Sequence, residues 1–493
     1  SAVPLELGTE KIGRLLKQSA LPAIIAQTAA SLYNMVDSIF IGQGVGPLAI
    51  SGLAVTFPLM NLSTAFGTLV GAGAATMLSV LLGQKNYKAA NKVLGNVVSL
   101  NIIIGAVFMA LALVFIDPIL YFFGASENTL PYAKEYMTII LIGNIITHLY
   151  FGLNAAMRSS GNPKKAMGLT IFTVVFNVIL DPIFIFVFDM GIAGAAWATV
   201  IAQTVAMFVV LHHFSDRRRP FHFEKGILRL DIRVAKDSMA IGMGPFLMNS
   251  AACLVTLFIN QQLRKYSGDL GIGAYGICNR FVFMFMMICM GLNQGMQPIA
   301  GYNYGARQYS RVKEVFWKTA KLAMVMTTLC FIFGMFFPRA AVGIFTQDEQ
   351  LMSLSAKALR IMTMIFPIVG FQMIATNFFQ SLGMVRKSVI LSLSRQILFL
   401  LPLLYLLPKW FDADGVWMSF PISDGMATLL TIFMLGRLFN KFSMLKDGDD
   451  PSVLGSQLSD YGQENHNYYR TSVRQRRKIR SRRIGCKARN PRI

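Results

Sequence analysis

The sequence predicts an all-α, polytopic membrane protein with twelve transmembrane helices in two six-helix bundles. Three observations carry this prediction: long apolar blocks, basic residues on alternate connections, and an internal repeat. Of the 493 residues, 54% are hydrophobic and only 14% are charged, well below the roughly 25% of charged residues in a soluble globular chain. The apolar residues gather in blocks of roughly 20 residues or more, the length that a bilayer requires of one span.

We predict the following spans: 18–41, 51–82, 93–116, 133–155, 166–188, 192–214, 236–264, 271–300, 316–338, 357–381, 387–407 and 414–438. The first apolar block lacks a small-residue cleavage site and runs into a second span, so we expect no cleavable signal peptide. Most Lys and Arg residues fall on the amino terminus and on the connections after even-numbered spans. This positive-inside pattern places both termini in the cytoplasm. It also explains the net charge of +22 by topology, so we expect no nucleic-acid partner.

The two halves of the chain repeat each other. Residues Gly83–Tyr87 match Gly305–Tyr309, and Gly161–Lys165 match Gly383–Lys387, in both cases 222 residues later. Because six spans is an even number, both halves insert with the same orientation. A pseudo-two-fold axis along the membrane normal then relates them, as in transporters built from parallel repeats.

The longest polar connection divides the halves. We predict an N-terminal six-helix bundle over residues 1–214, a cytoplasmic connecting loop over 215–236, a C-terminal six-helix bundle over 237–444, and a disordered basic tail over 445–493. The tail lacks hydrophobic periodicity and carries a basic run at Arg474–Arg483. It either contacts anionic lipid on the cytoplasmic face or is a dispensable extension.

Five ionisable residues stand out at membrane depth: Asp37, Asp181, Arg280, Arg395 and Asp424. Each costs roughly 2.5–3.5 kcal/mol on insertion scales, so each requires a reason. In the second half the two arginines and Asp424 can neutralise one another, and we favour a structural ion pair there over a role in substrate binding.

The first half holds only acids at this depth. Tyr33 and Asn34 precede Asp37 by four and three residues, which places them on the same helical face. Asn177 precedes Asp181 by four residues. The simplest alternative is that each acid only joins helices by hydrogen bonds, but two acids with matching polar partners favour a functional site.

The predicted topology places Asp37, Asp181 and Thr199 in the outer half of the bilayer, where they can converge. Thr199 and Gln203 repeat the four-residue spacing on the sixth span. Carboxylate, amide and hydroxyl oxygens in a dry site suit a hard cation. The pair of acids can equally store a proton, because two buried carboxylates repel each other when both are charged.

Two prolines have a mechanical interpretation. Pro182 removes a helix hydrogen bond beside Asp181 and permits a kink, and Pro22 does the same early in the first span. We therefore expect helix kinks at Pro22 and Pro182. The five cysteines and five histidines show no metal-binding spacing, and the chain offers no catalytic constellation, so we do not expect an enzyme.

Three motifs resemble hallmarks of the multidrug and toxic compound extrusion (MATE) family. They are Asn34–Ser38, Gly161–Pro163, and the pattern of Gln294, Gln297, Pro298, Gly301, Asn303, Gly305 and Ala306. The segment Asn177–Pro182 is similar to the DinF-like prokaryotic branch. The resemblance covers about residues 8–440.

The resemblance implies two bundles in a V shape and export of amphipathic, often cationic drugs, coupled to inward flow of Na⁺ or H⁺. It places the coupling-cation site at Asp37, Asn177, Asp181 and Thr199. It also gives four weaker candidates for substrate binding: Tyr33, Asn34, Tyr136 and Asn154. We add Gln203 to these candidates.

We therefore expect a cation-coupled antiporter in the cytoplasmic (inner) membrane of a bacterium or archaeon. It would act as a monomer on small molecules, in contact with membrane lipid. It would need no cofactor and no metal other than Na⁺ as a coupling ion. The alternative is a flippase for a lipid-linked precursor. An acidic cavity in the first half counts against it, because a pyrophosphate would need a cationic one.

Overall fold

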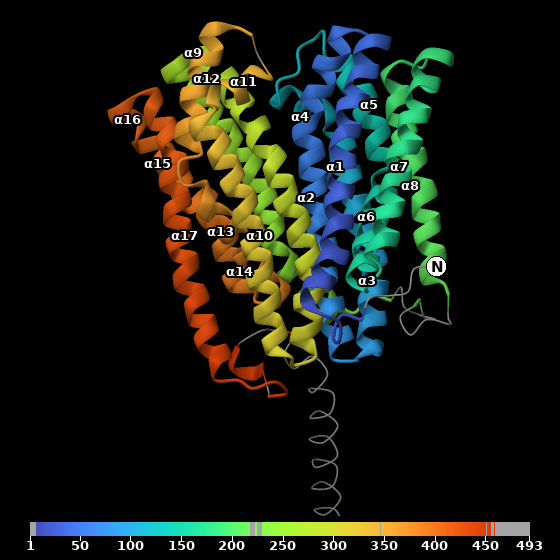
Figure 1. Ribbon diagram of the computed structural model, residues 1–493. Coiled ribbons are helices and arrows are strands. Elements are labelled where there is room, and N and C mark those ends of the chain that lie inside the picture. Colours follow the sequence, from blue (N-terminus) through green and yellow to red (C-terminus); the bar gives the residue numbers. More distant parts are fainter. Residues whose placement is uncertain are drawn as a thin grey trace, which may run out of the picture.

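The computed structural model describes residues 6–216, 222–223, 229–345, 347–449, 451–454 and 458. These residues are helical or irregular and contain no strand. The helices stand side by side in two groups that correspond to the two halves of the chain (Figure 1).

The first half is built from eight α-helices and one π-helix. They are α1 (Ile12–Gly44), α2 (Pro47–Gly83), α3 (Tyr87–Val114), α4 (Ile116–Phe122), α5 (Leu130–Ile142), α6 (Asn144–Ser159), α7 (Pro163–Pro182), the π-helix η1 (Ile183–Val187) and α8 (Ile192–Phe214).

The second half begins with the long helix α9 (Ile232–Gly305), which a break at Gly268 (φ 69°) divides into two spans. The remaining elements are α10 (Tyr309–Phe336), α11 (Pro338–Gly343), α12 (Glu349–Met362), α13 (Phe366–Ser381), α14 (Val385–Leu393), the π-helix η2 (Ser394–Leu400), α15 (Leu401–Leu406), α16 (Pro408–Phe411), α17 (Ala413–Ser443) and the short 3₁₀-helix η3 (Pro451–Leu454).

The described helices account for the predicted twelve spans. Ten helices are long and apolar enough to cross a membrane. Two more spans are bent pairs, α5 with α6 at 55° and α12 with α13 at 58°. These pairs are the fourth spans of the two halves, so the same distortion occurs at the same place in each repeat.

Two predicted boundaries differ from the structure. Helix α9 begins at Ile232, inside the predicted connecting loop, because the Asp231 side chain accepts hydrogen bonds from the amides of Arg233 and Val234 and caps the helix. In the segment predicted as the tail, Leu454 and Leu458 are buried against the helices. The basic run at 474–483 lies outside the described residues.

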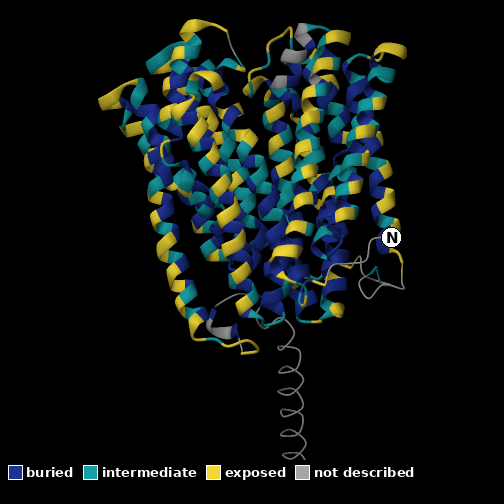
Figure 2. Cartoon of the chain, in the orientation of Figure 1, coloured by how far each residue is buried: buried dark blue, intermediate teal, exposed yellow. Residues whose placement is uncertain are grey.

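The two halves meet at one end of the molecule, which we call the closed end. It is the end at which α1, α3, α9 and α10 begin. A large buried cluster there joins both halves and includes Leu15, Val93, Val234 and Val312, and a small one joins Val70 and Leu100 to Ala235. Three other clusters are each confined to one half. Figure 2 shows the buried residues gathered where the two groups of helices meet, with exposed residues on their outer faces. Many of these exposed side chains are large and apolar, as expected of faces that contact lipid.

Glycine contacts at the closed end follow the repeat. A Cβ atom at Gly83 would overlap the carbonyl oxygen of Tyr302, and one at Gly305 would overlap the carbonyl oxygen of Val80. Gly83 and Gly305 are 222 residues apart, and so are Val80 and Tyr302. The two contacts are therefore equivalent under the pseudo-two-fold axis, and both need a residue without a side chain.

Candidate functional site

The first-half acids form one buried cluster. Asp37 on α1 and Asp181 on α7 are 5% and 0% exposed. The two carboxyl groups lie close to each other, and the Tyr33 hydroxyl lies near Asp37. The Tyr33 hydroxyl in turn lies 3.0 Å from the Thr199 hydroxyl on α8. The structure thus brings together Asp37, Asp181 and Thr199 as the sequence predicts, with Tyr33 as the link.

Several oxygens of this cluster receive no hydrogen bond from a donor in the described chain. They are both carboxyl oxygens of Asp181, Oδ1 of Asp37, and Oδ1 of Asn177, which is also buried. A buried acceptor without a donor is costly, and two adjacent carboxylates repel each other strongly in a medium of low dielectric constant. A proton shared by the carboxyls, or a hard cation held by the oxygens, would remove both costs.

The oxygens suit Na⁺ or H⁺ better than a transition metal. No group of three His, Cys, Asp or Glu residues that could hold a metal ion occurs within the described part of the chain. Any cation held here would therefore depend on amide and hydroxyl oxygens beside the two carboxylates. Such an all-oxygen set is typical of hard cations.

Other predicted substrate residues lie beside this cluster. Tyr136 is buried within electrostatic range of both acids, whereas Asn34 is exposed. Gln203 lies one helical turn after Thr199 on α8, and its Oε1 accepts a hydrogen bond of 2.5 Å from Thr147 on α6. Two cavities, of about 500 and 110 Å³, are lined by other residues. Their lining does not include Tyr33, Asn34, Tyr136 or Gln203.

A cavity of about 500 Å³ lies between the two halves. Of the predicted site residues, Asn154 lines it. Thr147 and His148 are also on its wall, and the His148 Nε2 lies 3.1 Å from the Ser63 carbonyl oxygen. The charged residue among the described lining residues is Arg158. Neither Asp37 nor Asp181 lines this cavity; the acids lie between α1, α7 and α8.

The second half contributes amide side chains to this wall. They are Asn293, Gln294, Gln297, Asn377 and Gln380. Sequence reasoning missed most of their role because single amides in apolar spans carry no charge and cost less to bury than an acid. A search for amides spaced by three or four residues would have found Asn293 with Gln297 and Asn377 with Gln380.

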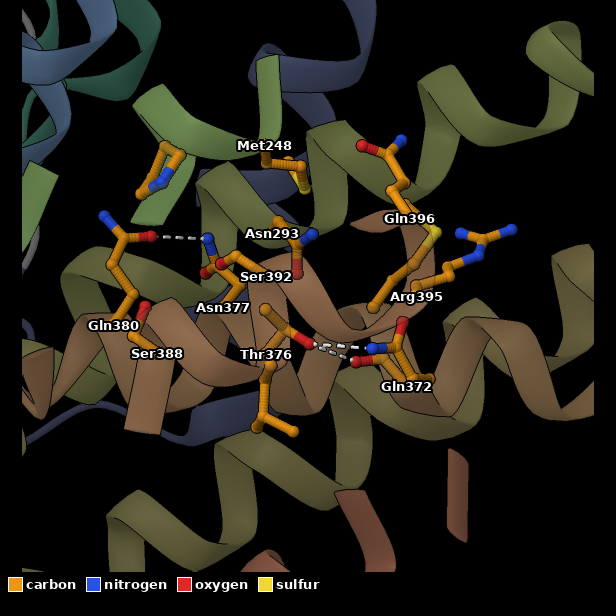
Figure 3. Close-up of a pocket in the computed structure, with 13 residues that line it drawn as sticks. Met248, Asn293, Gln372, Thr376, Asn377, Gln380, Ser388, Ser392, Arg395 and Gln396 are labelled. Atoms are coloured by element: carbon orange, nitrogen blue, oxygen red, sulfur yellow. Dashed lines mark hydrogen bonds between the residues drawn. The ribbon is translucent and has the colours of Figure 1, made fainter. Parts of the chain in front are cut away.

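A smaller cavity of about 110 Å³ adjoins the first and shares Asn293, Asn377 and Gln380 with it. Figure 3 shows its polar lining, where Asn377 donates to Gln380 over 3.0 Å. Arg395 and Gln396 lie at its other side.

The ion pair that the sequence favours for the second half is present. Arg395 Nε donates to Asp424 Oδ1 over 2.5 Å. Asp424 is buried, so the pair neutralises a charge that would otherwise be costly. Arg280 is exposed and is not part of this pair.

Comparison with known proteins identifies similar sequences. The MatE family model matches residues 22–183 and 241–406. The multidrug export protein MepA of Staphylococcus haemolyticus is 27% identical over 438 residues, which is 88% of this chain and 96% of that protein. MepA of Staphylococcus aureus is 27% identical over 425 residues, which is 86% of this chain and 94% of that protein.

Solved structures are similar over the same length. The MATE multidrug transporter DinF-BH, solved as a complex with a small molecule, is 36% identical, with a TM-score of 0.83, and the match covers 90% of this chain and 100% of that one. An outward-facing multidrug resistance MATE family transporter of the MOP superfamily is 22% identical, with a TM-score of 0.81, over 89% of this chain and 98% of that one. The second likeness concerns the fold alone.

Proposed function

We infer the function of this chain from its family, because the chain belongs to the MatE family. It has the multi-pass helical fold of that family, and its relatives are multidrug transporters. We propose that it exports amphipathic, often cationic compounds across the cytoplasmic membrane. The driving force would be inward flow of Na⁺ or H⁺, with the site facing each side of the membrane in turn. As in the sequence-based expectation, it would work as a monomer and without a cofactor.

The observation that carries the ion-coupled part is the pair of unsatisfied carboxyl groups. Asp37 and Asp181 lie on different helices, so an ion bound between them holds α1 against α7. Losing the ion would restore the repulsion between the carboxylates and favour separation of those helices. Asn177 and Thr199 would complete an oxygen shell for Na⁺, and for H⁺ the carboxyl pair alone suffices.

A series of contacts connects the acids to the cavity. The Tyr33 hydroxyl lies near Asp37 and 3.0 Å from the Thr199 hydroxyl. One turn along α8, Gln203 accepts a hydrogen bond from Thr147, which lines the cavity. The state of the carboxyl pair can thus reach the substrate through α8 although neither acid lines the cavity. In this mechanism ion binding repositions the wall at Thr147 and weakens the binding of exported compound.

The test is efflux of a fluorescent organic cation from proteoliposomes, with Na⁺ and pH gradients imposed separately. We expect one gradient to drive efflux, and we expect Asp37→Asn and Asp181→Asn each to abolish the gradient-driven part. The matched control is Glu135→Gln, which neutralises an exposed acid on α5 and should retain the wild-type rate. Full gradient-driven efflux in the Asp37→Asn, Asp181→Asn double variant would contradict the mechanism.

The alternative, translocation of an anionic lipid-linked precursor, gains support from one observation. Arg158 is on the cavity wall, and a guanidinium binds phosphate well. The same proteoliposomes with a labelled polyprenyl phosphate decide between the two functions. Arg158-dependent movement of that lipid, without efflux of the cation, would favour the flippase.

A further inference from the structure

A third hollow lies away from the transport cavities, on the outer surface. It has a volume of about 610 Å³ and is formed by α1, α9 and α10. These helices come from different halves, and the lower parts of α1 and α10 lie near each other in the middle of Figure 1. We call this hollow the α1–α10 groove.

The floor of the groove is a close contact between the halves. A Cβ atom at Gly291 would overlap Ile24, and one at Gly295 would overlap Ala20. Ile288 and Leu292 of α9 form the rest of the floor. The groove therefore lies directly over a line along which the two halves touch.

The lining changes in character along the groove. Three lysines line it in the first halves of α1 and α10, namely Lys17, Lys318 and Lys321. Farther along the same helices the lining is apolar, with Leu21 on α1 and Val325 on α10, which are 48% and 57% exposed. Since a helix rises about 1.5 Å per residue, Leu21 and Val325 each lie about 6 Å beyond Lys17 and Lys321, nearer the membrane centre.

The charge of the groove is positive. Lys318 pairs with Glu314 over 3.0 Å, and both side chains are about half exposed. Lys17 and Lys321 are exposed and form no ion pair with a described residue. Lysines at this level can extend their ammonium groups to the lipid headgroups, where they attract anionic lipid.

We propose that the α1–α10 groove binds one anionic phospholipid. Its phosphate contacts Lys17, Lys318 and Lys321, and an acyl chain lies along Leu21, Leu322 and Val325. Because the walls belong to both halves, the bound lipid connects them and favours the arrangement in which the closed end is shut. The binding claim stands apart from the transport mechanism, since it concerns a surface that neither acid nor cavity touches.

The test is native mass spectrometry of the detergent-purified full chain titrated with phosphatidylglycerol or with phosphatidylcholine. We expect preferential retention of phosphatidylglycerol by the wild type. The triple variant Lys17→Gln, Lys318→Gln, Lys321→Gln should bind it at least about tenfold more weakly. The control triple Lys88→Gln, Lys164→Gln, Lys236→Gln removes the same charge from exposed lysines at the starts of α3, α7 and α9 and should bind as the wild type does.

A second variant tests the apolar part with the charges intact. Val325→Trp fills the groove from an exposed position, so it should fold and yet weaken phosphatidylglycerol binding. Equal loss in the two triple variants, equal retention of both lipids by the wild type, or unchanged binding by Val325→Trp would each overturn the proposal. Competition by inorganic phosphate as effective as that by the lipid would overturn it too, because the acyl chain would then contribute nothing.

Discussion

At the residue scale, the membrane-embedded part of the chain buries carboxyl groups in two different ways. Asp424 has a guanidinium partner, whereas Asp37 and Asp181 face each other with oxygens that receive no described donor. The first arrangement is electrically complete and suits a permanent structural role. The second is incomplete without a proton or cation and suits a site that fills and empties. In the proposed mechanism, the same residue type serves stability in one half and ion coupling in the other.

Loss of the Asp424 carboxylate, which pairs with Arg395, should destabilise the folded protein. Asp424→Ala leaves the Arg395 charge without its partner and should destabilise the protein by roughly 3 kcal/mol. Thermal unfolding in detergent micelles measures this. The double variant Asp424→Leu, Arg395→Met should recover most of the loss, because it removes both charges. A double variant as unstable as the single one would show that the pair does more than neutralise a charge.

If the hydrogen bond between Thr147 and Gln203 on α8 connects the acids to the cavity, breaking it should leave cation binding intact and reduce gradient-driven efflux. Gln203→Leu removes the acceptor of the Thr147 hydroxyl but leaves both acids. We expect cation binding, measured by calorimetry, to stay near the wild-type value while gradient-driven efflux falls about tenfold or more, the factor that corresponds to roughly 1.4 kcal/mol of coupling energy. Thr204→Val is the control, because Thr204 on the same helix bonds only to the Val200 carbonyl. Equal effects in the two variants would contradict the link.

Outside the membrane, Asp447 predicts a pH dependence. Hydrogen bonds from the Ser310 hydroxyl (2.7 Å) and amide (3.1 Å) lower the pKa of Asp447. A lowered pKa means that this contact stabilises the folded chain above the ordinary Asp value of about 4 and is lost as the pH falls through the lower folded value. The protection factors of residues 309–312, which compare their hydrogen exchange with that of an unstructured chain at the same pH, should therefore be higher at neutral pH than below about pH 4. Asp447→Ala should show the low protection factors already at neutral pH, and protection factors independent of pH in the wild type would contradict the assignment.

The sequence predicts most of the residue-scale site and misses the cavity wall. Charge at membrane depth identifies Asp37, Asp181 and Asp424, because burial of a carboxylate is costly enough to need a cause. It does not tell whether an acid faces a cavity or packs behind its wall, since that depends on how three helices rotate against one another. Asn293 and Asn377 carry no such cost, so no comparable signal marks them.

At the element scale, the fifth span of each half contains a π-helix. η1 directly follows Asp181 and Pro182, and η2 carries Arg395. π-Helical turns are rare and occur mostly at functional sites. Pro182 contributes to the first by withholding an amide hydrogen. The sequence predicts a kink at Pro182 but not the π-helix that follows it, because a wider helical turn over five or seven residues leaves no distinct periodicity.

Replacing Pro182 should lower the efflux rate without lowering the stability of the protein. Pro182→Ala restores a backbone donor beside Asp181, so the helix should become more regular and the protein no less stable. Efflux should fall, because the carboxyl would no longer be held toward α1. Efflux rate and unfolding temperature are the measurements, and Pro131→Ala, at the first turn of α5 where proline is tolerated, should change neither. A wild-type rate in Pro182→Ala would show that the proline is incidental to transport.

At the scale of the whole molecule, the duplicated sequence becomes a duplicated set of contacts. Gly73 packs against Gly242, and the positions 222 residues away in the repeat, Gly295 and Ala20, also pack together. The repeat in the sequence therefore predicts the symmetry of the closed end. The bends within the two fourth spans were not predicted, because each span reads as one continuous apolar block.

The glycine contacts predict how to open the closed end. Gly83→Val places side-chain atoms where the Tyr302 carbonyl oxygen lies, so the halves should separate there. Spin labels at Lys88 and Glu314, in a background without native cysteines, should show longer distances by double electron–electron resonance. Gly436→Val is the control, since nothing lies within 4 Å of a Cβ atom at that glycine. An unchanged distance distribution in Gly83→Val would contradict the role of this contact.

The contact of Gly83 and Gly305 with opposing carbonyl oxygens also bears on how such a chain can vary. Closure there depends on the backbone, while the cavity wall depends on side chains such as Asn154 and Gln380. The range of compounds accepted can therefore change by substitution without altering the closing step. In a laboratory selection for resistance to a new compound, we expect the gained substitutions to fall on the cavity wall and both glycines to stay unchanged.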